Sequence, residues 1–297
     1  MFLRLYRCIH YAIVFIVLNF SVPEANGQKY TVERQALGKI KDSRLQELSG
    51  LISSFLYPNM FWVHNDSGDM SRIFLLDDKA QLKAVYTLAG VHTKDTEDIA
   101  RFQRDGKSFL VLADIGDNRA LREDIKIYIF KEPEWNRGQS EYIISEDAIY
   151  TIRLKYADKP RDAEAMFVDP VDGNGYIIAK RDLNVGVYPV VFNDRDSTQI
   201  LKPVVNLPLT FITSADISDD GHEVLLKNLT HVFLWKRKNH EPIKSLFARS
   251  FEQLSYDPEP QGEAICFGME NSVFYTISER PLGLDSYLYR YKISPIK

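Results

Sequence analysis

The sequence predicts an all-β protein, a five-bladed β-propeller that is closed by its N-terminal strand. Three observations predict this fold. Helical periodicity is scarce after residue 28, where short β-branched and aromatic runs alternate with turn residues instead. An acidic motif recurs before apolar runs, as "KDTEDIA" (94–100), "RDAEAMF" (161–167) and "QGEAICF" (261–267). The spacing of these motifs fits a repeat of about 50 residues with about four strands, which is the layout of a propeller blade.

The repeat is measured from the apolar residue two places after each glutamate, namely Ile99, Met166 and Ile265. The intervals between these residues are 67 and 99, and the second interval is about two units long. A degenerate copy is therefore expected midway, and "SADIS" (214–218) supplies it. "ELSGL" (47–51) supplies another copy, about one unit before the first glutamate motif.

The N-terminal segment predicts export. Arg4 and Arg7 precede a run of mostly apolar residues, and small residues follow before Gln28, which is the layout of a secretory signal peptide. The apolar run is short for a membrane span, which needs roughly 20 residues, although an uncleaved anchor is the alternative. We expect cleavage of residues 1–27, a single propeller domain over 28–297, and a secreted or periplasmic protein without stable membrane insertion.

Composition excludes some classes of partner and site. The 297 residues are 45% apolar and 26% charged, which is ordinary for a globular protein. The formal charge is −4, and the loss of two Arg and one Glu with residues 1–27 makes it −5. This mild acidity argues against nucleic acid as a partner. Cys8 would leave with the signal peptide, and Cys266 lies in an apolar run, so we expect a core cysteine and no disulfide framework.

Five units follow one another along the chain. They are predicted to span about 47–90, 97–156, 164–207, 215–254 and 263–293. The second unit is long because of an insertion after "DIGDN", and splitting it gives a six-bladed alternative. The fifth unit has only three obvious strands. Residues 30–40 are predicted to supply its fourth strand, which would join both ends of the chain in one sheet and hide the sheet edges.

Polar residues are expected to gather at one mouth of the ring, because the first strand of a blade starts where the second strand ends. The strand starts bring Glu97, Glu164 and Glu263, with Ser49 and with Ser214 or Asp216 in the degenerate units. The strand ends bring "HNDSGD" (64–69), "ADIGDNR" (113–119), "AKRD" (179–182), "LKN" (226–228) and "SER" (278–280).

Three carboxylates around a narrow channel repel one another, so they must protonate, pair with cations or bind a metal ion. Oxygen donors without His or Cys suit Ca²⁺, so the sequence predicts a divalent cation held by Glu97, Glu164 and Glu263. The alternative is scaffolding. The glutamates would then bond backbone N–H groups of neighbouring blades, or pair with Lys180 and Arg181.

Several motifs carry a family resemblance: "HNDSGD", "DTEDIA", "DIGDNRA", "KEP" and "RDAEAM". With them, the mature chain resembles secreted bacterial propeller proteins of largely uncharacterised function. More distantly, the pattern is similar to the calcium-activated nucleotidase (apyrase) family, five-bladed propellers that hold Ca²⁺ with serine and glutamate at blade starts. The resemblance implies metal ligands at Ser49, Glu97, Glu164 and Glu263, and at Ser214, which is one place off the strict register.

Basic residues are expected above the acidic channel. Lys180, Arg181 and Lys227, with Arg119 and Arg280, would place positive charge around the mouth. Such donors beside a metal ion suit an anionic small-molecule ligand that carries phosphate or carboxylate.

The metal ion could also activate a water molecule, with Asp66 or Asp114 as the candidate base. His64 is a candidate acid–base group, and the alternative for it is a hydrogen-bonding turn residue. "DIGDN" has two interpretations as well. It is either part of the site or a turn in which Gly116 supplies an unusual backbone angle.

Two classes of function remain. The first is a Ca²⁺-dependent hydrolase that acts on an anionic, phosphorylated small molecule or another ester. The second is a non-catalytic extracellular module that binds a ligand or a protein, with a structural metal ion or none. The sequence contains no G-x-S-x-G, H-E-x-x-H, phosphate-loop or paired C-x-x-C motif that would support a serine-hydrolase or zinc-protease function.

Overall fold

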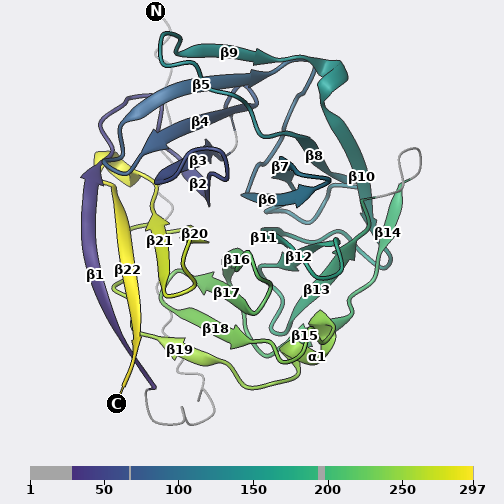
Figure 1. Ribbon diagram of the computed structural model, residues 1–297. Coiled ribbons are helices and arrows are strands. Elements are labelled where there is room, and N and C mark those ends of the chain that lie inside the picture. The colour runs from purple at the N-terminus through teal and green to yellow at the C-terminus, as the bar shows by residue number, and fades with distance from the viewer. Residues whose placement is uncertain (1–28, 67, 193–197, 297) are drawn as a thin grey trace, which may run out of the picture.

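Five sheets are arranged in a ring around a common axis in the computed structural model, which describes residues 29–66, 68–192 and 198–296 (Figure 1). The predicted signal peptide, residues 1–27, lies outside the described residues. Among the described residues, no helix is both long and apolar enough to cross a membrane. The predicted all-β five-bladed propeller is confirmed.

Each blade has its first strand at the channel and later strands farther out (Figure 1). Blade one consists of β2 (Leu48–Ser53), β3 (Met60–Asn65), β4 (Arg72–Asp77) and β5 (Leu82–Leu88). Blade two consists of β6 (Asp98–Arg104), β7 (Lys107–Asp114), β8 (Ile125–Lys131) and β10 (Tyr150–Tyr156). Blade three consists of β11 (Ala163–Val168), β12 (Gly175–Ala179), β13 (Val185–Val190) and β15 (Val205–Leu207). Blade four consists of β16 (Ile212–Ile217), β17 (Glu223–Asn228), β18 (Val232–Lys236) and β19 (Glu252–Leu254).

The long second unit does not split into a sixth blade. Part of its insertion, β9 (Glu141–Ile144), crosses to blade one and adds a parallel strand outside β5. In the same way β14 (Gln199–Leu201), from the third unit, adds a parallel strand outside β10. Three short helices lie in connections: η1 (Glu146–Ala148), α1 (Ile243–Phe247) and η2 (Pro281–Gly283). The inserted strands thus cover the outer edges of the preceding blades.

Blade five contains both ends of the described chain. It consists of β20 (Ala264–Phe267), β21 (Val273–Ile277), β22 (Tyr287–Pro295) and the N-terminal strand β1 (Tyr30–Lys39). The β1–β22 ladder is antiparallel and has a bulge between Ala36 and Gly38. A Cβ on Gly38 would lie 2.0 Å from the carbonyl oxygen of Lys79, so this bulge requires glycine. The predicted closure by residues 30–40 is confirmed.

Inner strands have apolar side chains on both faces because each lies between two neighbouring blades. All residues of β2, β11 and β16 are buried, as is Cys266 on β20. Such strands have continuous apolar runs instead of the alternation of a half-exposed sheet. The continuous apolar run after each acidic motif therefore marks the innermost strand of a blade.

Two buried aspartates connect the blades below the mouth of the channel. The Asp98 carboxylate accepts hydrogen bonds from the Met166 N–H of blade three (2.9 Å) and the Ala215 N–H of blade four (3.3 Å). The Asp216 carboxylate accepts one from the Phe267 N–H of blade five (2.7 Å). Burial raises the pKa of Asp98 well above its usual value and that of Asp216 to about 7. Hydrogen bonds between acidic side chains and backbone N–H groups of neighbouring blades are therefore present. Aspartates accept them, instead of the glutamates for which the scaffolding alternative expected them.

Deletion of residues 28–40 should expose the whole edge of β22 and leave blade five with three strands. Because an unpaired edge favours aggregation, we expect aggregated or rapidly proteolysed protein without a cooperative thermal transition. Limited proteolysis and a thermal melt measure this, with deletion of residues 1–27 alone as the control. A 28–40 deletion as stable as this control would contradict the role of β1 in closing the ring.

Candidate metal centre

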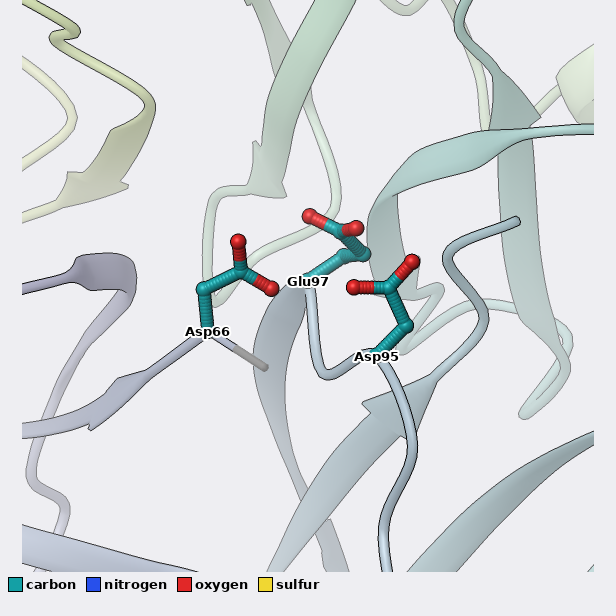
Figure 2. Close-up of side chains that lie close together, drawn as sticks. All are labelled: Asp66, Asp95 and Glu97. Atoms are coloured by element: carbon teal, nitrogen blue, oxygen red, sulfur yellow. The ribbon is translucent and has the colours of Figure 1, made fainter. Parts of the chain in front are cut away.

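Carboxylates from blades one, two and three converge at the mouth of the channel. Asp66, Asp95 and Glu97 form one group, and Glu97, Asp162 and Glu164 form another. In each group, one ligand oxygen per residue lies within 4.8 Å of the others. Figure 2 shows the first group, in which the three carboxylates are turned toward a shared space. Glu97 belongs to both groups and therefore lies at the centre of the cluster.

The backbone around Glu97 explains how these acids come so close. Glu97 donates its N–H to the Ala113 carbonyl (2.9 Å), and Gly116 donates its N–H to the Asp95 carbonyl (3.1 Å). A Cβ on Gly116 would lie 2.1 Å from Glu97 Oε1 and 2.6 Å from the Asp95 carboxyl carbon. Gly116 does not have a positive φ, so the interpretation of "DIGDN" that invoked an unusual backbone angle is wrong. Glycine is needed here because the two carboxylates lie against its α-carbon.

Asp114, a predicted base, supports the loop beneath the cluster. Its Oδ1 accepts hydrogen bonds from the N–H groups of Lys94 (3.2 Å) and Asp95 (3.0 Å) and from Arg122 Nη1 (2.8 Å). The side chain is buried. These contacts assign Asp114 to holding the Asp95 backbone in place.

The three predicted glutamates surround a cation that belongs to the chain. The buried Lys180 ammonium donates a hydrogen bond to Glu164 Oε1 and lies 3.9 Å from Glu263 Oε1. Burial alone would lower the pKa of Lys180, but the charges of Glu164, Glu263 and Glu97 raise it. Lys180 is therefore not a free rim cation as predicted. Its contact with Glu164 is the lysine–glutamate pairing that was the alternative to metal binding.

The mouth is nevertheless crowded with acid. Burial raises the pKa of Glu164 to about 8, helped by the charge of Glu263 and opposed by Lys180. Burial and the charges of Glu164 and Asp66 raise the pKa of Glu97 well above its usual value. Burial and the charge of Glu263 also raise the pKa of Glu279 to about 8. These shifts indicate that the carboxylates lack sufficient positive charge.

Glu164 Oε2 adds an independent indication of a missing partner. It is buried and has no hydrogen-bond partner among the described residues, although Oε1 of the same carboxylate is bonded to Lys180. A buried acceptor without a partner costs roughly 1–3 kcal/mol, and more when it is charged. A cation or a proton at this oxygen would remove that cost.

The other predicted basic residues differ in their placement. Arg181 pairs with Asp162 and donates to the Asn118 side chain, so it neutralises part of the cluster. Lys227 lies wholly buried beneath the mouth, where its ammonium donates to the carbonyls of Gly262 and Asn228. Burial lowers the pKa of Lys227 to about 8. Its predicted place on the rim is therefore wrong.

Arg119 and Arg280 lie in the loops that follow the second strands of blades two and five. Arg119 is exposed, whereas Arg280 is half-buried and donates its backbone N–H to the Gln46 carbonyl (2.8 Å). Of the basic residues predicted for the rim, Arg119 and Arg181 are thus the two exposed to solvent.

His64 is packed inside blade one. Its Nδ1 lies 2.9 Å from the Asn65 carbonyl oxygen, and its Nε2 lies 2.1 Å from the place of a Cβ on Gly50. Burial lowers the pKa of His64 to about 4, so the ring is neutral near neutral pH. His64 contacts the adjacent backbone, as in the alternative of a hydrogen-bonding residue, although it lies near the end of β3 instead of in a turn.

The serines that the family resemblance implied as ligands make contacts between blades. The Ser49 hydroxyl donates to the Glu97 carbonyl oxygen (3.0 Å), and the Ser214 hydroxyl lies 3.3 Å from both Asp98 carboxylate oxygens. Ser49 holds the backbone of Glu97, while Ser214 lies in the deeper layer with Asp98.

Sequence reasoning missed Asp162, and it assigned Asp66 to proton transfer instead of metal binding. A signal for the missing ligand exists in the spacing Asp-x-Glu, which occurs at 95–97 and again at 162–164. The third copy has Gln261 in place of the aspartate, which agrees with the position of Glu263 outside both groups. Each Asp-x-Glu lies at the start of a first strand and places two carboxylates at the mouth.

Comparisons with known proteins show no family for this chain. No family model matches the chain, and no curated protein matches it. Among solved structures, the chain is similar in fold to the PQQ-bound form of an aldose sugar dehydrogenase from Streptomyces coelicolor. The similarity covers 92% of this chain and 100% of that one, at 9% identity and a TM-score of 0.49.

Without divalent cations, the protein should lose stability as pH rises from about 4.5 to 8. The pKa of Glu164 is about 8 in the folded state against an ordinary 4.5. Its neutral form therefore favours folding, and this contribution is full below the unfolded pKa and is lost as pH rises through the folded pKa. The loss should be on the order of 4 kcal/mol, measured by denaturant unfolding in chelator. Glu164→Gln should flatten the profile, whereas a profile unchanged by Glu164→Gln would contradict the assignment.

Proposed function

We propose that the protein is an exported binding module that holds one divalent cation, Ca²⁺, at the mouth of its channel. The observation that carries this proposal is the pair of carboxylate groups that share Glu97. Oxygen donors alone, in an irregular arrangement from different loops, suit Ca²⁺ better than the transition metals that prefer nitrogen and sulfur.

The cation belongs on the Asp66 and Asp95 side of Glu97. On the other side, the Lys180 ammonium already donates a hydrogen bond to Glu164, and Arg181 pairs with Asp162. Asp66 and Asp95 are only half-buried, so an ion between them and Glu97 would keep some of its water molecules. Those water positions can be exchanged for oxygen atoms of a ligand.

An anionic small molecule is the ligand class that we propose for this ion. Its carboxylate or phosphate would replace water on the exposed side of the cation and coordinate the ion through its oxygen atoms. Binding is favoured over hydrolysis by two observations. His64 is neutral and buried, and Asp114 is engaged by Arg122 and two backbone amides.

A thermal melt tests the cation site directly. Ca²⁺ that binds only the folded protein adds about 2.7 kcal/mol at a hundredfold excess over its Kd, so chelator should lower the melting temperature by several degrees. Glu97→Gln removes the shared charge and should abolish this response. Glu134→Gln is the matched control and should respond like the wild type. Glu134 is exposed and follows the end of β8 that points away from the mouth.

Two outcomes would oppose the proposal. If chelator leaves the wild type unchanged, no divalent cation is bound. If Glu97→Gln melts higher than the wild type and neither protein responds to Ca²⁺, the carboxylates only repel one another and serve as scaffolding.

Lys180→Met tests whether lysine and metal ion share one acidic cluster. Breaking a buried ion pair by removing one partner costs about 3–5 kcal/mol, so the variant should be strongly destabilised in chelator at pH 8. Ca²⁺ should recover most of this loss and bind more tightly than in the wild type, because one competing cation has gone. Calorimetric titration measures the affinity, with the exposed Lys155→Met as control. Equal affinity in both proteins would show that Lys180 and the ion do not interact.

A further inference from the structure

A second site lies away from the channel, on the outer part of the ring. A cavity of about 510 Å³ separates the β8–β10 side of blade two from the loop that follows β5 of blade one. Its walls include Gly90, His92, Lys126, Tyr128, Glu146 and Arg153. None of these residues belongs to the carboxylate groups of the metal centre. The volume is in the range of small-molecule sites.

One wall of this cavity places two cations side by side. In the antiparallel β8–β10 ladder, Lys126 pairs directly with Arg153, and Tyr128 pairs with Thr151 two residues farther along. Directly opposed residues in such a ladder project from the same face, with Cβ atoms about 5 Å apart. Like charges in this arrangement destabilise a sheet. The wall is therefore built at a cost in stability.

Nearby acids do not cancel this charge. Asp114 pairs with Lys126 across β7 and β8, but its carboxylate is bonded to Arg122. Asp124 lies 3.5 Å from Arg153 in an exposed pair, which contributes little. Within the described part of the chain, the Lys126 ammonium forms no ion pair. Lys126 and Arg153 therefore keep most of their positive charge along this wall.

The opposite wall presents a carboxylate. Glu146 lies across Gly90, where an added Cβ would come within 2.5 Å of its Oε2. Gly90 also has a φ of +70°, a conformation that favours glycine. The absence of a side chain at position 90 therefore gives the Glu146 carboxylate its place at the cavity wall. The cavity is positive on the strand side and negative on the loop side.

We propose that this cavity binds a small organic anion that also carries hydroxyl or ammonium groups. Its carboxylate or phosphate lies between Lys126 and Arg153, where it removes their mutual repulsion and gains charge-assisted hydrogen bonds. Its hydroxyl or ammonium group donates to Glu146, and Tyr128 lines the space between. A neutral polyol cannot offset the two cations, and a simple anion leaves Glu146 unused.

Calorimetric titration of the full mature chain in chelator tests the site while the channel holds no metal ion. The probes are gluconate, glycerol phosphate and, as the neutral control, sorbitol. Wild type should bind at least one of the two anions. Binding of gluconate indicates a carboxylate site, and binding of glycerol phosphate indicates a phosphate site. Lys126→Met and Arg153→Met should each weaken that binding at least tenfold. Lys107→Met, at the far end of the same sheet, should leave it unchanged.

Two further measurements separate binding from general charge effects. Lys126→Met should melt higher than the wild type without ligand, because it removes one of two opposed like charges. Glu146→Gln should weaken binding of the organic anion but leave binding of inorganic phosphate unaffected.

The inference is overturned if neither anion binds the wild type at millimolar concentration, if sorbitol binds as well as the anions, or if Lys126→Met binds like the wild type. Because the titration is done in chelator, these results do not depend on the metal centre.

Discussion

Repulsion among carboxylates at the mouth of a narrow channel is the constraint on which the rest of this structure depends. Blades that converge on one axis bring their strand starts together, so an acid at each strand start meets the others. The acids lie in two layers along the axis, and each layer has different partners. In the deeper layer, Asp98 and Asp216 use backbone N–H groups of neighbouring blades, while Lys180 neutralises the Glu164 side of the mouth. The Asp66 and Asp95 side is the part suited to an added cation.

A single motif supplies both layers. In "KDTEDIA", Asp95 and Glu97 precede β6 and contribute to the mouth, whereas Asp98 is the first residue of the strand and bonds blades three and four. Successive residues of an extended chain point in opposite directions, so adjacent acids can take different roles. Scaffolding and metal binding were alternative interpretations of one acidic repeat. In the structure, Asp98 bonds neighbouring blades, while Asp95 and Glu97 belong to a carboxylate group that could hold a metal ion.

The fold could be predicted from sequence because blades repeat and the repeat is visible as short apolar runs after an acidic residue. The convergence of Glu97 and Glu164 followed from the same register. The position of the lysines did not, because it depends on where each second strand ends. Lys180 follows the last residue of β12, but Lys227 lies within β17, one residue before its end and opposite Ser214. A shift of one residue moves a side chain from the rim to the interior, and no local pattern marks it.

The pairing of β1 with β22 also determines when the molecule can finish folding. Tyr30 meets Pro295, so the first strand to emerge during synthesis must wait for almost the last residue of the chain. Until then, the N-terminal strand and the growing ring both present unpaired edges that are open to wrong partners. Contacts between such distant residues make folding slow, because the entropy of closing the largest loop is lost before the contacts of the final sheet stabilise the fold. The N-terminal strand is thus the first part of the propeller to be synthesised and the last to find its place.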